Sequence, residues 1–157
     1  MPPGPAPSRR VSLEQASDPT LQTWLAMWRV YQKVQRELDG VLSDAGLTIA
    51  QFDVLANLGM SEGITQQELA ERLLVTKGNV CGVLDRMESA GLVERRPDPK
   101  DRRANRLYLT RPGRVALHNA FPTHLGVIQQ CFEALSPAER RTLHELVTRL
   151  GQAECFG

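Results

Sequence analysis

The chain has 157 residues, with 19 Lys or Arg against 18 Asp or Glu, so its formal net charge is only +1. Hydrophobic residues make up 41% of it, enough for a core, and this length suits one domain with helical extensions. No long apolar run predicts a transmembrane helix, and the N-terminal sequence MPPGPAPSRR lacks the apolar segment of a secretory signal. We therefore expect a cytoplasmic protein without a membrane partner.

The cysteines and histidines show no metal or disulfide pattern. Cys81, Cys131 and Cys155 lie far apart without a CxxC pair, and the histidines form no HExxH motif or short ligand cluster. No Ser/His/Asp or Cys/His arrangement and no Gly-rich phosphate loop stands out. We expect no metal, no cofactor and no enzymatic activity, and a reducing compartment is the simplest setting for three free thiols.

The N-terminal part predicts a tail followed by one long helix. Residues 1–17 are rich in Pro, Ser and Gly, a composition typical of disorder. Asp18 and Pro19 then form a helix start, with Asp as the N-cap and Pro at the first helical position. Apolar residues recur at helical spacing up to Leu42, and the helix should end near Gly46. A long amphipathic helix needs a partner, and a second copy of the chain is a natural one.

Three shorter helices are predicted next. Sequences of the capping-box type at residues 48–51 and 65–68 start two of them, and the second helix is short. A third helix is expected from about Thr76 to Ala90, with Gly91 as its C-cap. A tight turn must join the second helix to the third.

A basic hairpin follows the third helix. Two β-type runs, Leu92–Arg96 and Leu107–Leu109, flank a polar loop that contains Pro and Arg. Residues 95–114 include eight basic residues against two acidic ones, Asp98 and Asp101. Positive charge concentrated on a projecting hairpin attracts a phosphate backbone, although such a loop can also be a solvated surface.

Two further helices complete the chain. One begins near Thr110, with Pro122 expected to kink it, and a capping box at Ser136 starts the last. The order of helix, short helix, turn, helix and hairpin predicts a mainly α fold with a small β-wing, a winged helix-turn-helix. The expected regions are a winged helix-turn-helix at 46–110 between helical dimerisation segments at 18–45 and 111–157.

These residues resemble the MarR family of bacterial transcription regulators. The resemblance rests on GLTIAQFDVLANL (46–58), ITQQELAERLLVTKGNVCGVLDRMESAGLVERRPDPKDRRANRLYLT (64–110) and TRPGRVAL (110–117), and it covers roughly residues 20–152. The most specific parts are the TKGNV…LDRMESAGLV block and the DxR motif at residues 101–103. The resemblance implies a two-fold symmetric dimer, joined by its N- and C-terminal helices. It also implies binding to a palindromic operator, most often as a repressor that small phenolic or lipophilic compounds release.

The third helix is expected to enter the major groove with its first turn toward the DNA. Lys77 and Asn79 are then assigned to base edges or phosphates, without a choice between them. Thr76 is an N-cap, a role compatible with a phosphate contact. Gln66 and Gln67, at the start of the preceding helix, could hold phosphates or simply face solvent.

The wing supplies the remaining expected DNA contacts. By the resemblance, Arg103 enters the minor groove, where a narrow A·T-rich segment has an enhanced negative potential. Asp101 is expected to orient an arginine through a bidentate pair, and Arg102 and Arg106 are expected at phosphates. Arg95 is also assigned to DNA; its neighbour on the strand points to the opposite face, so only one of the two can readily reach the duplex.

Five residues form a possible effector pocket. Arg86 could pair with Asp53 of an earlier helix, or join an inducer pocket between the dimer helices and the winged helix. Trp24, Trp28 and Tyr31 on the first helix are more often dimer core, although an aromatic ligand could stack on them.

Two alternatives remain open. In a thiol-sensing regulator on the same scaffold, oxidation of Cys81 in the third helix would disturb DNA contact. The first long helix has no cysteine near its start, where oxidant-sensing members of the family place theirs, and this weighs against the mechanism. The other alternative is a winged-helix protein-interaction module, but such modules typically lose the basic wing that this chain keeps.

Overall fold

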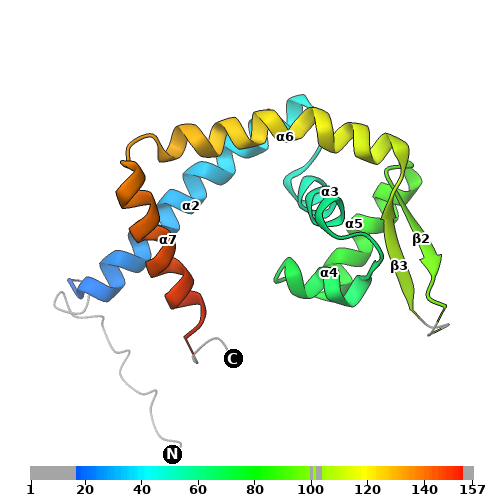
Figure 1. Cartoon of the computed structure of the whole chain (residues 1–157), viewed down its shortest axis with the longest axis horizontal. Coiled ribbons are helices and arrows are strands. Elements are labelled where there is room, and N and C mark those ends of the chain that lie inside the picture. Colours follow the sequence, from blue (N-terminus) through cyan, green and yellow to red (C-terminus); the bar gives the residue numbers. More distant parts are fainter. Residues whose placement is uncertain (1–16, 100, 102–103, 154–157) are drawn as a thin grey trace, which may run out of the picture. The chain divides into compact units, whose positions relative to one another are not determined.

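The computed structural model describes residues 17–99, 101 and 104–153. It confirms a mostly helical fold with a small antiparallel sheet (Figure 1). Over these residues, no helix is both long and apolar enough to cross a membrane. The elements in chain order are α2 (Pro19–Asp44), α3 (Ile49–Met60), β1 (Ile64–Thr65), α4 (Gln66–Arg72), α5 (Lys77–Ser89), β2 (Val93–Pro97), β3 (Asn105–Leu109), α6 (Arg111–Phe132) and α7 (Pro137–Gly151).

Side-chain caps start the helices where the sequence predicts them. Thr48, Thr65 and Ser136 each form a complete capping box, in which the side chain of the third helical residue returns to the N-cap amide. Thr76 caps α5 by accepting a hydrogen bond from the Asn79 amide at 3.3 Å. Such caps satisfy amide groups that the first helical turn leaves without partners, so they fix where each helix begins.

The sheet has the strand order β1-β3-β2, with both pairings antiparallel. β1 is only two residues long and was not predicted from the sequence, because its Thr65 is also the N-cap of α4. β3 is therefore the central strand, and it joins the hairpin to the start of the helix-turn-helix. The register pairs Val93 with Leu109 and Arg95 with Leu107, so these four residues share one face of the hairpin.

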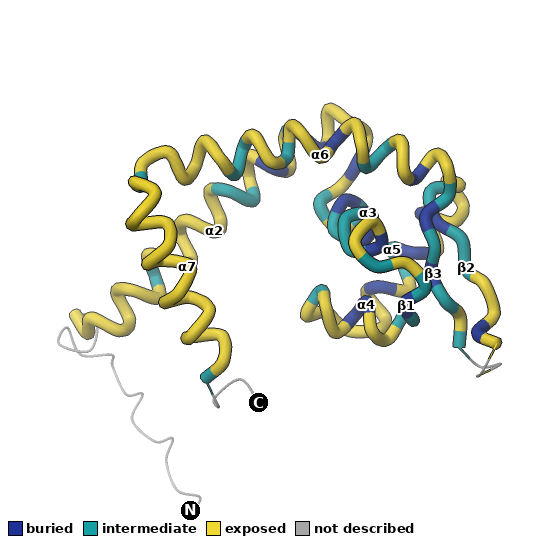
Figure 2. Tube along the Cα trace, in the orientation of Figure 1, coloured by how far each residue is buried: buried dark blue, intermediate teal, exposed yellow. Residues whose placement is uncertain are grey.

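The buried core belongs to the second of two compact units, residues 37–157. Its buried residues come from α3, α4, α5 and the strands, which are partly dark blue in Figure 2. The core extends beyond the expected 46–110 segment, because Leu42 of α2 and Ala120 of α6 are buried with it. In the first unit, no side chain within residues 17–36 is buried.

The backbone is unusual at two positions. Leu74, in the turn between α4 and α5, has φ 53°, a left-handed conformation that costs a non-glycine residue about 1–2 kcal/mol. Its side chain is 92% exposed, so packing does not offset this strain. Pro122 lies inside α6, and the helix continues past it to Phe132.

The first turn of α6 packs closely against the end of α5. The Thr110 hydroxyl accepts a hydrogen bond from the Gly113 amide at 3.1 Å and donates one to the Gly91 carbonyl at 2.6 Å. Gly91 itself has φ 70°, as expected for a glycine just past a helix end. A Cβ atom at Gly113 would lie only 1.9 Å from the Leu92 carbonyl oxygen, so no other residue fits there without a backbone shift.

Gly113→Ala should therefore lower the free energy of unfolding by about 2–4 kcal/mol, because the added methyl group overlaps backbone atoms. Urea denaturation followed by circular dichroism would measure the change. The matched control is Gly82→Ala in α5, where the nearest atom to the new Cβ is Arg86 Nη1 at 3.8 Å. This control should gain up to about 1 kcal/mol from its higher helix propensity. Equal stability of the two variants would contradict the close packing at Gly113.

Candidate nucleic-acid interface

The first turn of α5 presents a contiguous polar surface. Thr76, Lys77, Gly78 and Asn79 are all exposed, and Thr76 is held by its capping bond. The free amides of a helix N-terminus give this turn a partial positive charge, to which Lys77 adds a full one. Gln66, at the start of α4, is half-buried. The arrangement therefore offers hydrogen-bond donors and positive charge to an anionic partner.

Arg95 does not lie at the DNA-facing position expected from the sequence. It is on the face of the hairpin that also bears buried Val93, and its guanidinium contacts α5 instead of solvent. Nη1 lies 2.5 Å from the Glu88 carboxylate and Nη2 lies 2.6 Å from that of Asp85, with the Arg95 side chain only 15% exposed. Burial opposes the charge, but the hydrogen bonds from Asp85 and Glu88 outweigh it and raise the pKa of Arg95.

Arg106 is also held by the protein itself. Its Nη1 donates to the Gly63 carbonyl at 2.6 Å, and its Nη2 pairs with Asp98 at 2.8 Å. Asp98 is 6% exposed, so the pair anchors the hairpin beside the start of the helix-turn-helix. The expectation that Arg106 contacts phosphate is therefore not supported by its position, because both terminal guanidinium nitrogens already have a partner within the protein.

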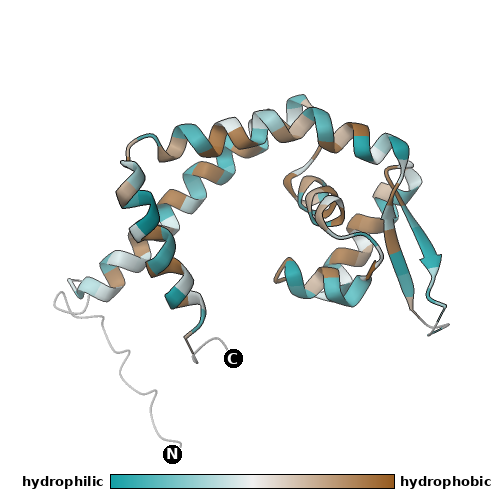
Figure 3. Ribbon diagram, in the orientation of Figure 1, coloured by the Kyte–Doolittle hydropathy of each residue, from teal (hydrophilic) through white to brown (hydrophobic). Residues whose placement is uncertain are grey.

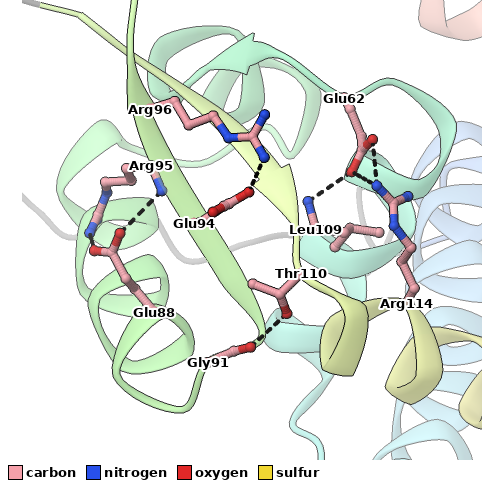
Figure 4. Close-up of polar contacts among 9 residues, drawn as sticks. All are labelled: Glu62, Glu88, Gly91, Glu94, Arg95, Arg96, Leu109, Thr110 and Arg114. Atoms are coloured by element: carbon pink, nitrogen blue, oxygen red, sulfur yellow. Dashed lines mark hydrogen bonds and ion pairs between the residues drawn. The ribbon is translucent and has the colours of Figure 1, made fainter.

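Arg96 is the arginine of β2 that faces away from α5. It is exposed, lies over the ring of Tyr108 with 4.3 Å to the centroid, and pairs with Glu94 (Figure 4). The alternation of a strand predicts that Arg95 and Arg96 point to opposite faces, and this is confirmed. The sequence alone does not show which face meets α5, and Arg96 was the residue left out of the expected contacts.

The tip of the hairpin is only partly described. Arg102 and Arg103 lie outside the described residues, as does Lys100. Asp101 is exposed, and its carbonyl accepts a hydrogen bond from the Ala104 amide at 3.0 Å. The Ala104 carbonyl in turn accepts one from the Asp98 amide at 3.0 Å, so hydrogen bonding between the two strands continues one residue beyond β2.

Glu62 fixes the other end of the hairpin. Its carboxylate accepts hydrogen bonds from the Leu109 amide and from the Arg114 guanidinium, each at 2.8 Å (Figure 4). Partial burial works to raise its pKa, but the hydrogen bonds from Arg114 and Leu109 lower the pKa of Glu62 overall. Sequence reasoning missed this residue, because its partners lie 47 and 52 positions further along the chain.

The expected effector residues divide between the two units. Trp24, Trp28 and Tyr31 belong to the first unit, and their side chains are 59%, 50% and 58% exposed. Asp53 and Arg86 belong to the second unit, and among the described residues they form no ion pair with each other. The pairing suggested from the sequence is therefore wrong.

The titratable group that acts electrostatically on Asp53 is His124 of α6. The His124 ring stacks on Phe52, with centroids 4.1 Å apart, and so joins α6 to α3. Burial raises the pKa of Asp53, an effect that His124 opposes. Burial also lowers the pKa of His124, an effect that Asp53 opposes. Each of the two groups thus lies in a partly apolar setting that disfavours its charged form.

One cavity lies between α3, the end of β3 and α6. It has a volume of about 610 Å³ and a mainly apolar wall. Its lining residues are Ala56, Gly59, Met60, Leu109, Arg114, Leu117, His118, Phe121 and Pro122. Asp53 lies instead on a smaller cavity of about 230 Å³, which it shares with Asn79 at the start of α5. Neither cavity includes Arg86, so the residues expected to form one pocket are not brought together by the second unit.

Two of the cysteines fall within the described part of the chain. Cys81 is exposed on α5, with its sulfur 3.9 Å from the Asp85 carboxylate, and Cys131 is exposed near the end of α6. Cys155 lies outside the described residues.

Asp53→Asn should stabilise the fold at neutral pH. Because burial raises the Asp53 pKa above 3.8, the stabilising contribution of this group is full below that value and is lost as pH rises through the higher folded-state pKa. At about pH 7 the variant should gain less than about 1 kcal/mol of unfolding free energy, since the site is partly solvated. The gain should shrink toward about pH 4, which urea denaturation at both pH values would show. Asp39→Asn, at an exposed position of α2, is the control, and a variant less stable than the native chain at neutral pH would contradict the expectation.

The comparisons with known proteins agree on one family. Residues 45–104 match the family model of the MarR family. An uncharacterized HTH-type transcriptional regulator of Bacillus cereus is 34% identical over 128 residues, covering 81% of this chain and 85% of the relative.

Solved structures show the same relationship. A cysteine-to-serine variant of MarR from E. coli, complexed with operator DNA, is 32% identical with a TM-score of 0.77, and the match covers 89% of this chain and 99% of that one. BpsR of Bordetella bronchiseptica, whose DNA binding is regulated by 6-hydroxynicotinic acid, is 27% identical with a TM-score of 0.76, over 83% of this chain and 99% of its own. With its winged helix-turn-helix and its basic hairpin, this chain belongs to the MarR family of DNA-binding transcriptional regulators.

Proposed function

We propose that this protein is a repressor that binds a palindromic operator as a homodimer and is released by a small ligand. In this proposal the first turn of α5 enters the major groove, and the wing follows into the adjacent minor groove. The main support is the exposed run from Thr76 to Asn79 at a helix N-terminus, in a fold that a relative uses on operator DNA. Lys77 and Asn79 then contact base edges or phosphates, and Arg103 reaches the minor groove.

The surface of α7 supports the dimer. None of its residues is buried, yet apolar residues recur along it (Figure 3). Four large ones lie at helical spacing. These are Leu143, Leu146, Val147 and Leu150, each 37–48% exposed. An apolar stripe of this kind is normally covered, and a second copy of the chain is the partner that a symmetric regulator provides. Two copies would then hold their recognition helices about one DNA turn, ~34 Å, apart.

Leu146→Glu should weaken this dimer, because it would place a charge inside a proposed apolar interface. Size-exclusion chromatography with light scattering, over a dilution series, would measure the dissociation constant of the dimer. This constant should be at least about tenfold higher for the variant than for the native chain. Thr148→Glu, on the opposite side of α7, adds the same charge and should leave the assembly unchanged. Equal dissociation of both variants would exclude the apolar face of α7 from the interface.

DNA binding can be tested by gel-shift titration against the chain's own upstream intergenic DNA, beside a scrambled duplex, across a salt series. The native chain should bind the intergenic DNA more tightly than the scrambled duplex, with an affinity that falls as the salt concentration rises. Arg103→Ala should weaken specific binding strongly. Arg102→Ala should weaken binding to both duplexes and reduce the slope of log affinity against log salt concentration by about one unit, as loss of a phosphate contact does. An unchanged salt slope in Arg102→Ala would show that Arg102 does not contact a phosphate. If no duplex is selected, a selection from random sequences would separate a distant operator from an absent DNA function.

The ligand is supported by the cavity of about 610 Å³ between α3 and α6, which falls within the usual size range of small-molecule sites. A relative whose DNA binding responds to 6-hydroxynicotinic acid supports an aromatic effector. Such a ligand would need to prefer a dimer with a different helix spacing by only ~1–3 kcal/mol. Adding salicylate or 6-hydroxynicotinate to the gel-shift assay should release the operator. Release by peroxide alone, abolished in Cys81→Ser, would instead favour thiol control.

A further inference from the structure

Three charged side chains join the wing to the recognition helix. Glu88 accepts from both the main-chain amide of Arg95, at 3.1 Å, and its guanidinium, at 2.5 Å (Figure 4). Asp85, one helical turn before Glu88, accepts from the other guanidinium nitrogen at 2.6 Å. The fork of an arginine matches two carboxylates in this way, whereas a lysine could not hold both with the same geometry. We call this group the Arg95 clamp.

The charge of the clamp argues against a role in holding phosphate. One guanidinium and two carboxylates leave a net negative charge at this place, and such a group repels a nucleic-acid backbone. Asp85 also lies six residues beyond Asn79, which is about 9 Å further along the helix than the turn expected in the groove. The Arg95 side chain is largely covered as well, so DNA cannot reach it without breaking the clamp.

The position of the clamp explains what it can do. β2 reaches α5 at the base of the wing, and the hairpin extends from there toward its tip. A rotation of about 10° about the base would move a point roughly 10 Å along the hairpin by about 2 Å, more than a hydrogen bond tolerates. Any wing contact in a minor groove therefore requires a fixed angle between β2 and α5 once α5 occupies the major groove.

We propose that Arg95 is a positioning residue for DNA binding: held by Asp85 and Glu88, it fixes the wing relative to the recognition helix and touches no phosphate. This inference rests on the proposed DNA-binding function and adds a residue that acts through others. Arg96, on the opposite face of the same strand, has no contact with α5 among the described interactions, and it provides a matched comparison.

The test uses the full-length protein, the operator duplex and a scrambled duplex, across a salt series. Arg95→Met keeps the apolar stem and removes the charge. It should lower operator affinity about tenfold, leave binding to the scrambled duplex unchanged, and keep the native salt slope. Arg95→Lys should give an intermediate loss, because one ammonium group can engage only one carboxylate well. Arg96→Met, which removes the same charge from the outer face, should leave the β2–α5 junction unaltered.

The double variant Asp85→Asn/Glu88→Gln gives the sharpest distinction. It makes the chain more positive by two charges, so simple electrostatics predicts tighter binding to any DNA. If Arg95 positions the wing, operator affinity should instead fall about fivefold or more, in the same direction as for Arg95→Met. Tighter operator binding by the double variant would overturn the proposal. So would a salt slope that falls by about one unit in Arg95→Met, with equal losses on both duplexes.

Hydrogen exchange without DNA separates this inference from the proposed function. Amide protons of β2 and β3 should exchange about tenfold faster in Arg95→Met than in the native chain and in Arg96→Met, since the clamp no longer holds the hairpin on α5. Unchanged exchange would overturn the positioning role. A native chain that selects no duplex would refute the proposed function, whereas the exchange rates would still decide whether the clamp fixes β2.

Discussion

The pairing of β3 with both β1 and β2 is the constraint on which the rest of the DNA-binding unit depends. β1 immediately precedes α4, β2 follows α5, and β3 leads into α6, so one strand connects three helices that are far apart in the chain. Leu107, in the middle of β3, is fully buried and lies opposite both Ile64 and Arg95. Side chains then secure the two ends of the hairpin, with Glu62 near α6 and the Arg106–Asp98 pair toward the tip.

This anchoring changes how the charge of the wing is understood. Of the five basic residues described between positions 95 and 114, four are in ion pairs within the protein, and only Arg111 has no such pair. Each pair reduces the positive charge that the hairpin offers to a distant phosphate. A count of arginines in the sequence therefore overstates the positive electrostatic potential of the wing. In the proposed function, attraction for DNA therefore rests more on the exposed first turn of α5 and on the tip than on the strands.

Much of the fold could be predicted from the sequence, because its signals are local. A capping box needs four consecutive residues, and an apolar stripe needs a few helical turns, so Thr48, Thr65 and Ser136 marked their helices correctly. The two-residue strand β1 has too little pattern of its own, and only its pairing with β3 makes it a strand. The face of Arg95 also could not be predicted, since strand alternation separates it from Arg96 without showing which of them meets α5. Glu62 gave no signal at all, because its partners are brought near only by the folded chain.

The uncovered apolar face of α7 has a further consequence for how such a regulator would respond to its own abundance. If two copies must associate before either can hold an operator, then at low copy number the fraction of occupied operators rises with the square of the chain concentration. A small change in synthesis near the dissociation constant of the dimer would then produce a disproportionate change in repression. Side chains such as Leu146 would thus set a threshold for gene control, although they lie on a helix outside the winged helix-turn-helix.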